Sequence, residues 1–386
     1  MNNITTSSKH IDWIDGLKGV SCLFIFFHHF FLQYYPASYY GNAQTSFLYG
    51  FDSLLASTPL GLIINGNFFV NLFIFISGYV ITYQVITMKP DNFGVFLFKR
   101  YLKLLFPLFI YSIIIFITKI PSLINQSGFI KSIIKELYKT GDSLIFGILF
   151  KGDTYLGGHL WMMHCIFLGG LLAAILASLF WVTNNRKIII LPVIIGILLL
   201  VFFLPLPRKI HFSAVFLGSA LCMLNKFYPV QIKKIFLYCL IIPGIFLGAF
   251  PSGLSPQNYY KFFLIPFDSG NGFSYCVWHC IAITILMFCF SYLSNIQTFF
   301  AKKTFLKLSK ISFWIFLLHN IIITYTKPLF DLLQKHLINY NISVLLIFLT
   351  DLLLLILASS FFAIMISPLG NRLINGIMAK LLPTKE

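Results

Sequence analysis

Apolar runs long enough to cross a membrane recur along nearly the whole of this 386-residue chain. A helix needs about 20 mainly apolar residues to cross a hydrocarbon core of ~30 Å. The sequence therefore predicts an all-α, polytopic membrane protein with about ten transmembrane helices, of which the fifth to seventh are short. The predicted spans are approximately 17–35, 60–84, 97–118, 159–182, 188–204, 210–225, 235–250, 273–293, 311–327 and 342–367.

The composition excludes a water-soluble domain. Apolar residues make up 58% of the chain and charged residues only 10%, against about 25% charged in soluble domains. The run 143–150 is too short to span and is expected to be interfacial or re-entrant. The polar N-terminal residues are not expected to form a cleavable signal. We expect one membrane domain over 1–386, with no appended soluble domain.

The positive charge predicts the orientation of the chain in the membrane. The formal net charge is +17, but the basic residues lie in short loops between apolar runs, which disfavours nucleic-acid binding. With a cytoplasmic N-terminus, about 18 of the 28 Lys and Arg fall on the cytoplasmic side. The expectation is a multi-pass protein of the inner (cytoplasmic) membrane with both termini inside. Binding of an anionic substrate, a nucleotide-bearing donor or a lipid pyrophosphate, is a second use for the charge.

The first span carries the strongest functional pattern, Asp15-Gly16-Leu17-Lys18-Gly19 followed by His28 and His29. Lys18 and His29 are eleven residues apart, which on an α-helix returns to within ~20° of the same face after a rise of roughly 16 Å. A cation at the membrane surface and an imidazole near the midplane are thus predicted to face one cavity. We interpret this stripe as the donor end of an acyl-transfer site.

Each residue of this stripe has an alternative role. A neutral imidazole at His29 is a suitable general base for a hydroxyl that attacks a thioester, whereas an interhelical hydrogen bond is the competing role. Lys18 offers a compact cation for phosphate, or it is an interfacial anchor. His28 points roughly 100° away from His29 and is assigned, with Asp15, a supporting role.

Other blocks extend the pattern. Lys99, Arg100 and Lys103 cluster at a predicted cytoplasmic helix start, where they serve as a topology signal or contact phosphate; the bidentate fork of Arg100 makes it the best candidate. His319 is expected about 10 Å inside its span, and Trp161 at the outer interface; both are assigned supporting roles. The small pair Ser77-Gly78 predicts close helix packing.

A metal site is not predicted. All seven cysteines lie in or near apolar runs, where Cys usually acts as a small hydrophobe. Cys276-x-x-His279-Cys280 places two thiols on one helical face, but no spacing matches a zinc site. We expect no bound metal or cofactor.

Taken in order, these blocks resemble the acyltransferase-3 family of integral membrane acyltransferases, over about residues 10–370. Asp15–Gly19 followed by His29 resembles the family's Asp-Gly-Leu-Arg-Gly opening with its later His, although Lys18 replaces Arg. Phe69–Tyr79, Phe98–Pro107 and Ser312–His319 are similar to the Phe-Val-x-Leu-Phe-Phe-x-Leu-Ser-Gly-Phe, Arg-x-x-Arg-Leu-x-Pro and Ser-Tyr-x-Ile-Tyr-Leu-x-His segments. The segment from Trp161 lacks the two glutamates of Trp-Ser-Leu-Ser-Val-Glu-Glu and is closer to variants with His-Leu-Trp.

The resemblance implies an O-acyltransferase that moves an acyl group, often acetyl from acetyl-CoA as co-substrate, onto a hydroxyl of a cell-surface or lipid-linked sugar. It implies that His29 is catalytic, as base or as acyl carrier, and that Lys18 binds the donor. Arg100 and Lys103 are assigned to donor binding with it. The sequence leaves open the acceptor sugar, the acyl chain and the oligomeric state.

Two other classes compete with the enzyme. A transporter or flippase of a lipid-linked glycan fits the polytopic pattern, but the sequence shows no inverted repeat or matched pair of broken helices. A scaffold subunit of an envelope-glycan complex is less compatible with ionisable residues inside several spans.

Overall fold

The computed structural model describes residues 11–36, 54–55, 57–88, 92–124, 128–183, 185–202, 210–253, 258–265, 274–336 and 339–381. Every regular element within these ranges is helical, as predicted. In hydrocarbon each backbone N–H and C=O must be satisfied inside the segment, and a helix does this. The two chain ends, predicted to be cytoplasmic, lie outside the described residues.

Seven helical segments in the described part of the chain are long and apolar enough to cross a membrane. They are Asp12–Tyr34 (α1), Gly66–Met88 (α4), Phe93–Ile124 (α5), Gly158–Thr183 (which contains α7, Trp161–His164, and α8, Gly170–Thr183), Ser274–Tyr292 (α13), Lys303–Lys335 (α15) and Tyr340–Lys380 (which contains α16, Tyr340–Phe361). Each overlaps one of the predicted spans.

The predicted count of about ten is not confirmed, because the fifth to seventh spans are too short. Their helices are Ile190–Phe202 (α9), Phe212–Phe227 (α11) and Lys234–Gly248 (α12), of 13, 16 and 15 residues. At 1.5 Å per residue none is longer than ~24 Å, which is less than a ~30 Å core.

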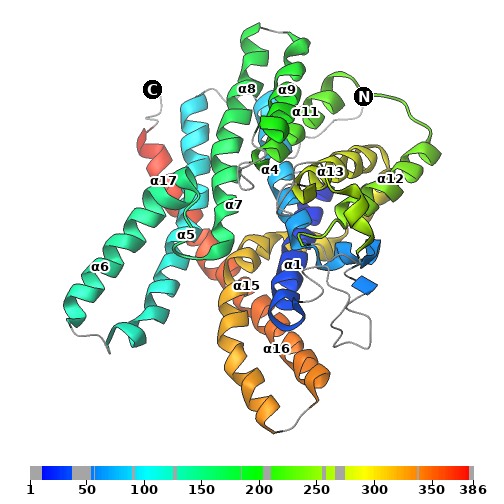
Figure 1. Cartoon of the computed structure of the whole chain (residues 1–386). Coiled ribbons are helices and arrows are strands. Elements are labelled where there is room, and N and C mark those ends of the chain that lie inside the picture. Colours follow the sequence, from blue (N-terminus) through cyan, green and yellow to red (C-terminus); the bar gives the residue numbers. More distant parts are fainter. Residues whose placement is uncertain are drawn as a thin grey trace.

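Further helices are Phe129–Asp142 (α6) and Ser294–Phe300 (α14), with short 3₁₀ segments at Pro59–Ile64 and Tyr259–Phe263. Ser367–Leu381 (α17) forms the last part of the seventh long segment. The run expected to be interfacial or re-entrant forms a π-helical segment, Ser143–Lys151, directly after α6. Figure 1 shows α15 and α16 extending together at one end of the molecule, with α8 and α9 at the opposite end.

The centre of the fold is made by α1, α4, α11 and α15. α1 packs along α15, and α4 packs against both α1 and α11. Of the seven long segments, α4 has the largest buried share. This arrangement places the first span, with its polar stripe, directly against the span that carries His319.

Glycines allow two of these contacts. A Cβ on Gly16 would meet the Phe300 carbonyl of α14, and one on Gly19 would lie 2.7 Å from the Ser309 nitrogen of α15. The glycines that flank Lys18 thus let α1 approach its neighbours at backbone distance.

The predicted close packing at Gly78 is confirmed. A Cβ on Gly78 would meet the carbonyl oxygen of Val215, and one on Gly218 would meet that of Phe75. Two glycines, one on each helix, therefore set the distance between α4 and α11.

Gly218→Val is expected to destabilise the protein by about 1–3 kcal/mol, because the new side chain overpacks a contact with backbone on the other side. The measurement is thermal unfolding of the detergent-solubilised protein. Gly376→Val in α17 is the matched control, since a Cβ there meets nothing within 4 Å. Equal melting temperatures for the two variants would contradict the proposed contact.

Candidate functional site

The cationic end of the site begins with Lys18. Its Nζ lies 2.8 Å from Oδ1 of Asp15, one turn earlier on α1, and the two side chains are 28% and 18% exposed. Both side chains of the ion pair stay partly exposed. Asp15 also lies in the first turn of α1, where a negative charge is favoured.

Lys18 and Arg100 line one cavity of about 270 Å³. Ser309 and Ser312 of α15 add hydroxyl groups to its wall. The other lining residues are Phe73, Ile76, Ser77, Val80, Leu104, Ile166 and Phe313. Two side chains that the sequence assigns to donor binding, 82 positions apart in the chain, therefore share one cavity.

Arg100 also borders a second cavity of about 280 Å³, together with Lys99, Lys103 and Gln84. Its Nη2 donates a hydrogen bond of 2.8 Å to Oγ of Ser77. Its Nε is buried with no hydrogen-bond partner among the described residues. Gly170 leaves room for the guanidinium, because a Cβ there would lie 3.2 Å from Nη2.

These two cavities bring the predicted donor-binding cations together. Lys18, Lys99, Arg100 and Lys103 line them, and Asp15 pairs with one of the four. Such a concentration of positive charge suits a ligand with several phosphates. The residue that the sequence interpretation underrated is Ser77, which it treated as packing and which in the structure holds Arg100.

Three imidazoles form the second half of the site. The rings of His29 and His319 have centroids 4.9 Å apart, and those of His319 and His159 are again 4.9 Å apart. The three residues come from three different spans. His29 is partly exposed, while His159 and His319 are buried. We refer to His29, His319 and His159 as the imidazole row.

The predicted shared face of Lys18 and His29 is therefore directed at α15. Lys18 lines its cavity with Ser312, and His29 contacts His319, which is seven residues further along α15. Seven residues of helix rise about 10 Å. The α1–α15 pair thus carries Lys18 and Ser312 of the cationic cavity at one level, and His29 and His319 of the imidazole row about 10 Å away along the helices.

His28 has a structural position. Its Nδ1 lies 2.8 Å from the Ile64 carbonyl, so the ring nitrogen donates this bond. A Cβ on Gly66 would collide with the ring, so His28 packs against the start of α4. This bond and this packing give His28 a role in joining α1 to the segment before α4.

Trp161 lies against a different histidine. Its ring centroid is 4.5 Å from that of His211, whose Nδ1 lies 2.5 Å from Oδ1 of Asn71. The sequence interpretation did not single out His211, which lies at the start of the predicted span 210–225. His279 lies 2.9 Å from the Phe250 carbonyl and 3.1 Å from Asn65. Within the described ranges, no three or more His, Cys, Asp or Glu side chains are arranged so that they could hold a metal ion.

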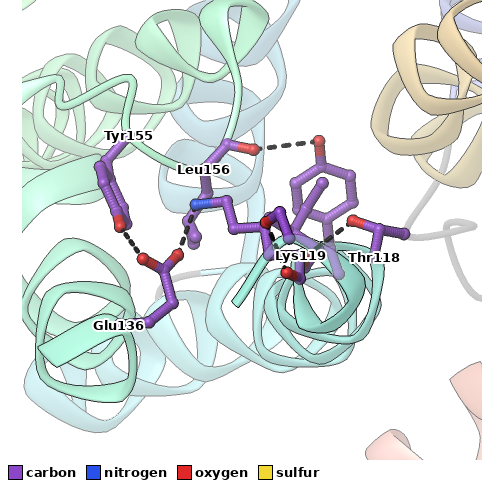
Figure 2. Close-up of polar contacts among 8 residues, drawn as sticks. Thr118, Lys119, Glu136, Tyr155 and Leu156 are labelled. Atoms are coloured by element: carbon purple, nitrogen blue, oxygen red, sulfur yellow. Dashed lines mark hydrogen bonds and ion pairs between the residues drawn. The ribbon is translucent and has the colours of Figure 1, made fainter. Parts of the chain in front are cut away.

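The segment just before His159 is anchored by a polar cluster on α5 and α6, shown in Figure 2. The Lys119 ammonium and the Tyr155 hydroxyl both donate to the carboxylate of Glu136. Lys119 also lies 4.2 Å from the centroid of the Tyr155 ring. The Tyr111 hydroxyl donates to the Leu156 carbonyl at 3.3 Å.

This cluster shifts two pKa values. Partial burial by itself raises the pKa of Glu136, but the hydrogen bonds from Lys119 and Tyr155 outweigh it and hold the pKa below its usual value. Burial and the neighbouring carboxylate raise the pKa of Tyr155 to about 12. Glu136 is therefore charged and Tyr155 neutral at neutral pH, the pair of states that the hydrogen bond requires.

The comparisons with known proteins give one match. A family model described as an acyltransferase domain matches residues 11–369, which is nearly the whole chain. No curated protein and no solved structure matches the chain.

The Glu136 cluster makes stability depend on pH. Folding lowers the pKa of the Glu136 carboxyl. Its contribution to the free energy of unfolding is therefore present above the unfolded pKa of about 4.3 and is lost as the pH falls through the lower pKa of the folded state. At pH 7, Glu136→Gln is expected to destabilise the protein by up to about 1 kcal/mol. The difference from wild type should narrow below about pH 4, as measured by thermal unfolding at both pH values. Lys131→Gln, on an exposed side chain of the same helix, is the control. A stability difference between Glu136→Gln and wild type that does not change with pH would contradict the lowered pKa of Glu136.

Proposed function

The chain belongs to the acyltransferase-3 family, and on this premise we propose that it moves an acetyl group from acetyl-CoA onto a hydroxyl of a cell-surface or lipid-linked sugar. The observation that supports this most is the pairing of α1 with α15, which carries Lys18 beside one cavity and His29 beside His319. The phosphates of the donor need a cationic cavity, and the reaction at the thioester needs a base such as an imidazole.

In the proposed reaction, the phosphates of acetyl-CoA lie near Lys18, Arg100 and Lys103. The pantetheine arm extends from the Lys18 cavity toward the level of His29, roughly 16 Å deeper along α1. This end of the protein is the cytoplasmic one in the proposed orientation, where acetyl-CoA is present. The membrane is the inner membrane, with both chain ends on the cytoplasmic side.

We assign His29 the role of general base. It accepts the proton of the sugar hydroxyl while the hydroxyl oxygen bonds to the thioester carbon. The carbonyl electron pair moves onto oxygen; when it returns, the C–S bond breaks and the CoA thiolate takes up the proton. His29 suits this role because it is the partly exposed member of the imidazole row.

His29→Ala is expected to abolish transfer without removing the protein from the membrane. The assay follows labelled acetyl from acetyl-CoA onto a sugar acceptor with purified protein in detergent, and mass spectrometry of surface glycans identifies the acceptor. His336→Ala, an exposed histidine at the end of α15, is the control. Undiminished transfer by His29→Ala would remove His29 from the mechanism.

The same assay separates the competing classes. Transport cannot occur in detergent, so label on a sugar excludes a function that is only that of a flippase or transporter. Acetyl-CoA supplied without an acceptor distinguishes the two roles of His29. As a base it leaves the protein unlabelled, whereas as an acyl carrier it becomes labelled in wild type and stays unlabelled in His29→Ala.

Lys18→Met is expected to weaken acetyl-CoA binding by about 10- to 100-fold, because a hydrogen bond between charged groups contributes about 1.5–3 kcal/mol. Lys18→Arg should bind nearly as well as wild type, since it keeps the charge. The measurement is the dissociation constant of acetyl-CoA by titration in detergent. Unchanged affinity in Lys18→Met would assign Lys18 to membrane anchoring instead.

A further inference from the structure

Two nitrogens in the imidazole row stand out because they are buried without a partner. Nε2 of His159 and Nε2 of His319 make no hydrogen bond to any described residue. Buried polar atoms are nearly always paired, and an unpaired one indicates a bound water or a role in chemistry. The two rings are adjacent, with centroids 4.9 Å apart, so both nitrogens belong to one small region.

The other nitrogen of His159 fixes where its proton lies. Nδ1 is 2.8 Å from the side-chain nitrogen of Asn320. With the Asn320 amide in this orientation, its NH₂ donates to Nδ1, which assigns the proton of the neutral ring to Nε2. Nε2 of His159 is therefore a hydrogen-bond donor with no acceptor of its own.

His319 has the opposite arrangement. Its Nδ1 lies 2.7 Å from the Phe316 carbonyl oxygen. A carbonyl only accepts, so the proton lies on Nδ1 and Nε2 carries a lone pair. One ring of the pair thus presents a donor and its neighbour an acceptor.

The ring of His159 is held firmly in this position. Its centroid is 5.1 Å from that of Phe316 and 5.9 Å from that of Tyr111. The backbone at Gly157 passes so close that a Cβ there would lie 2.9 Å from Cε1 of His159. A donor that is fixed before the reaction needs no reorganisation during it, which is the property of groups that stabilise developing charge.

We propose that His159 is a second catalytic residue, whose Nε2–H donates a hydrogen bond to the thioester carbonyl oxygen as that oxygen becomes negative. Asn320 is a positioning residue that keeps the proton on Nε2. This inference rests on the proposed acyl transfer. The proton of the sugar hydroxyl passes to His29 as the C–O bond forms. His159 stabilises the negative carbonyl oxygen until the C–S bond breaks and the CoA thiolate takes up the proton.

The kinetic test compares substitutions at His159. His159→Ala should lower kcat by about 10²- to 10³-fold, the usual effect of removing one such donor, with the dissociation constant of acetyl-CoA unchanged. His159→Gln, whose amide also donates, should recover part of the loss. His164→Gln, one turn later and bonded to the Leu149 carbonyl, is the matched control. A kcat within twofold of wild type for His159→Ala would overturn the proposal and leave a bound water as the partner of Nε2.

A second measurement does not depend on activity. In ¹⁵N-histidine-labelled protein, the ¹⁵N shifts of His159, assigned with His159→Gln, should show the proton on Nε2. Asn320→Asp offers an acceptor of the same shape, so it should move the proton to Nδ1 and lower kcat. A proton on Nδ1 in wild type would overturn the inference. A wild-type protein that transfers no acyl group to any sugar would instead refute the proposed function, while the tautomer is still measured.

Discussion

The contact between α1 and α15 is the one on which the rest of the site depends. Gly16 and Gly19 bring the backbone of α1 against α14 and α15, and polar groups on the facing sides then meet at two levels. Without this close approach, Lys18 would not share a cavity with Ser309 and Ser312, and His29 would not contact His319. The polar stripe is useful because the backbones that carry it are close.

Much of the fold follows from the sequence because lipid imposes a simple rule. A chain without water around it must satisfy its own backbone hydrogen bonds, so each long apolar run forms a helix that overlaps its expected span. α15 nevertheless has 33 residues, well beyond the expected 311–327. The expectation of a full span is not met at α9, α11 and α12, whose described helices have 13, 16 and 15 residues. Apolar composition alone therefore did not fix helix length in that region.

The geometry of the candidate site follows most directly from the sequence where a single helix determines it. Lys18 and His29 share a face because of the period of 100° per residue, and a sequence shows that period directly. The link from His159 to Asn320 spans 161 positions, and that from Arg100 to Ser77 joins two helices. An asparagine beside His319 was a visible signal, but its role depends on a partner from another span. The contact of Trp161 with His211 likewise joins two segments that are distant in the sequence, so the sequence alone did not reveal it.

Arg100 has a consequence for how ligands are told apart. One of its nitrogens already donates to a neutral partner, the hydroxyl of Ser77, so an anionic oxygen gains more from replacing that partner than an uncharged oxygen does. Bonds to ionised acceptors are roughly twice as strong as those between neutral groups. Under the proposed function, a short thioester without phosphates would gain little at this point. The protein would then distinguish donors by their phosphates, which lie far from the acyl group that is transferred. The identity of the acyl group itself would be selected less strictly.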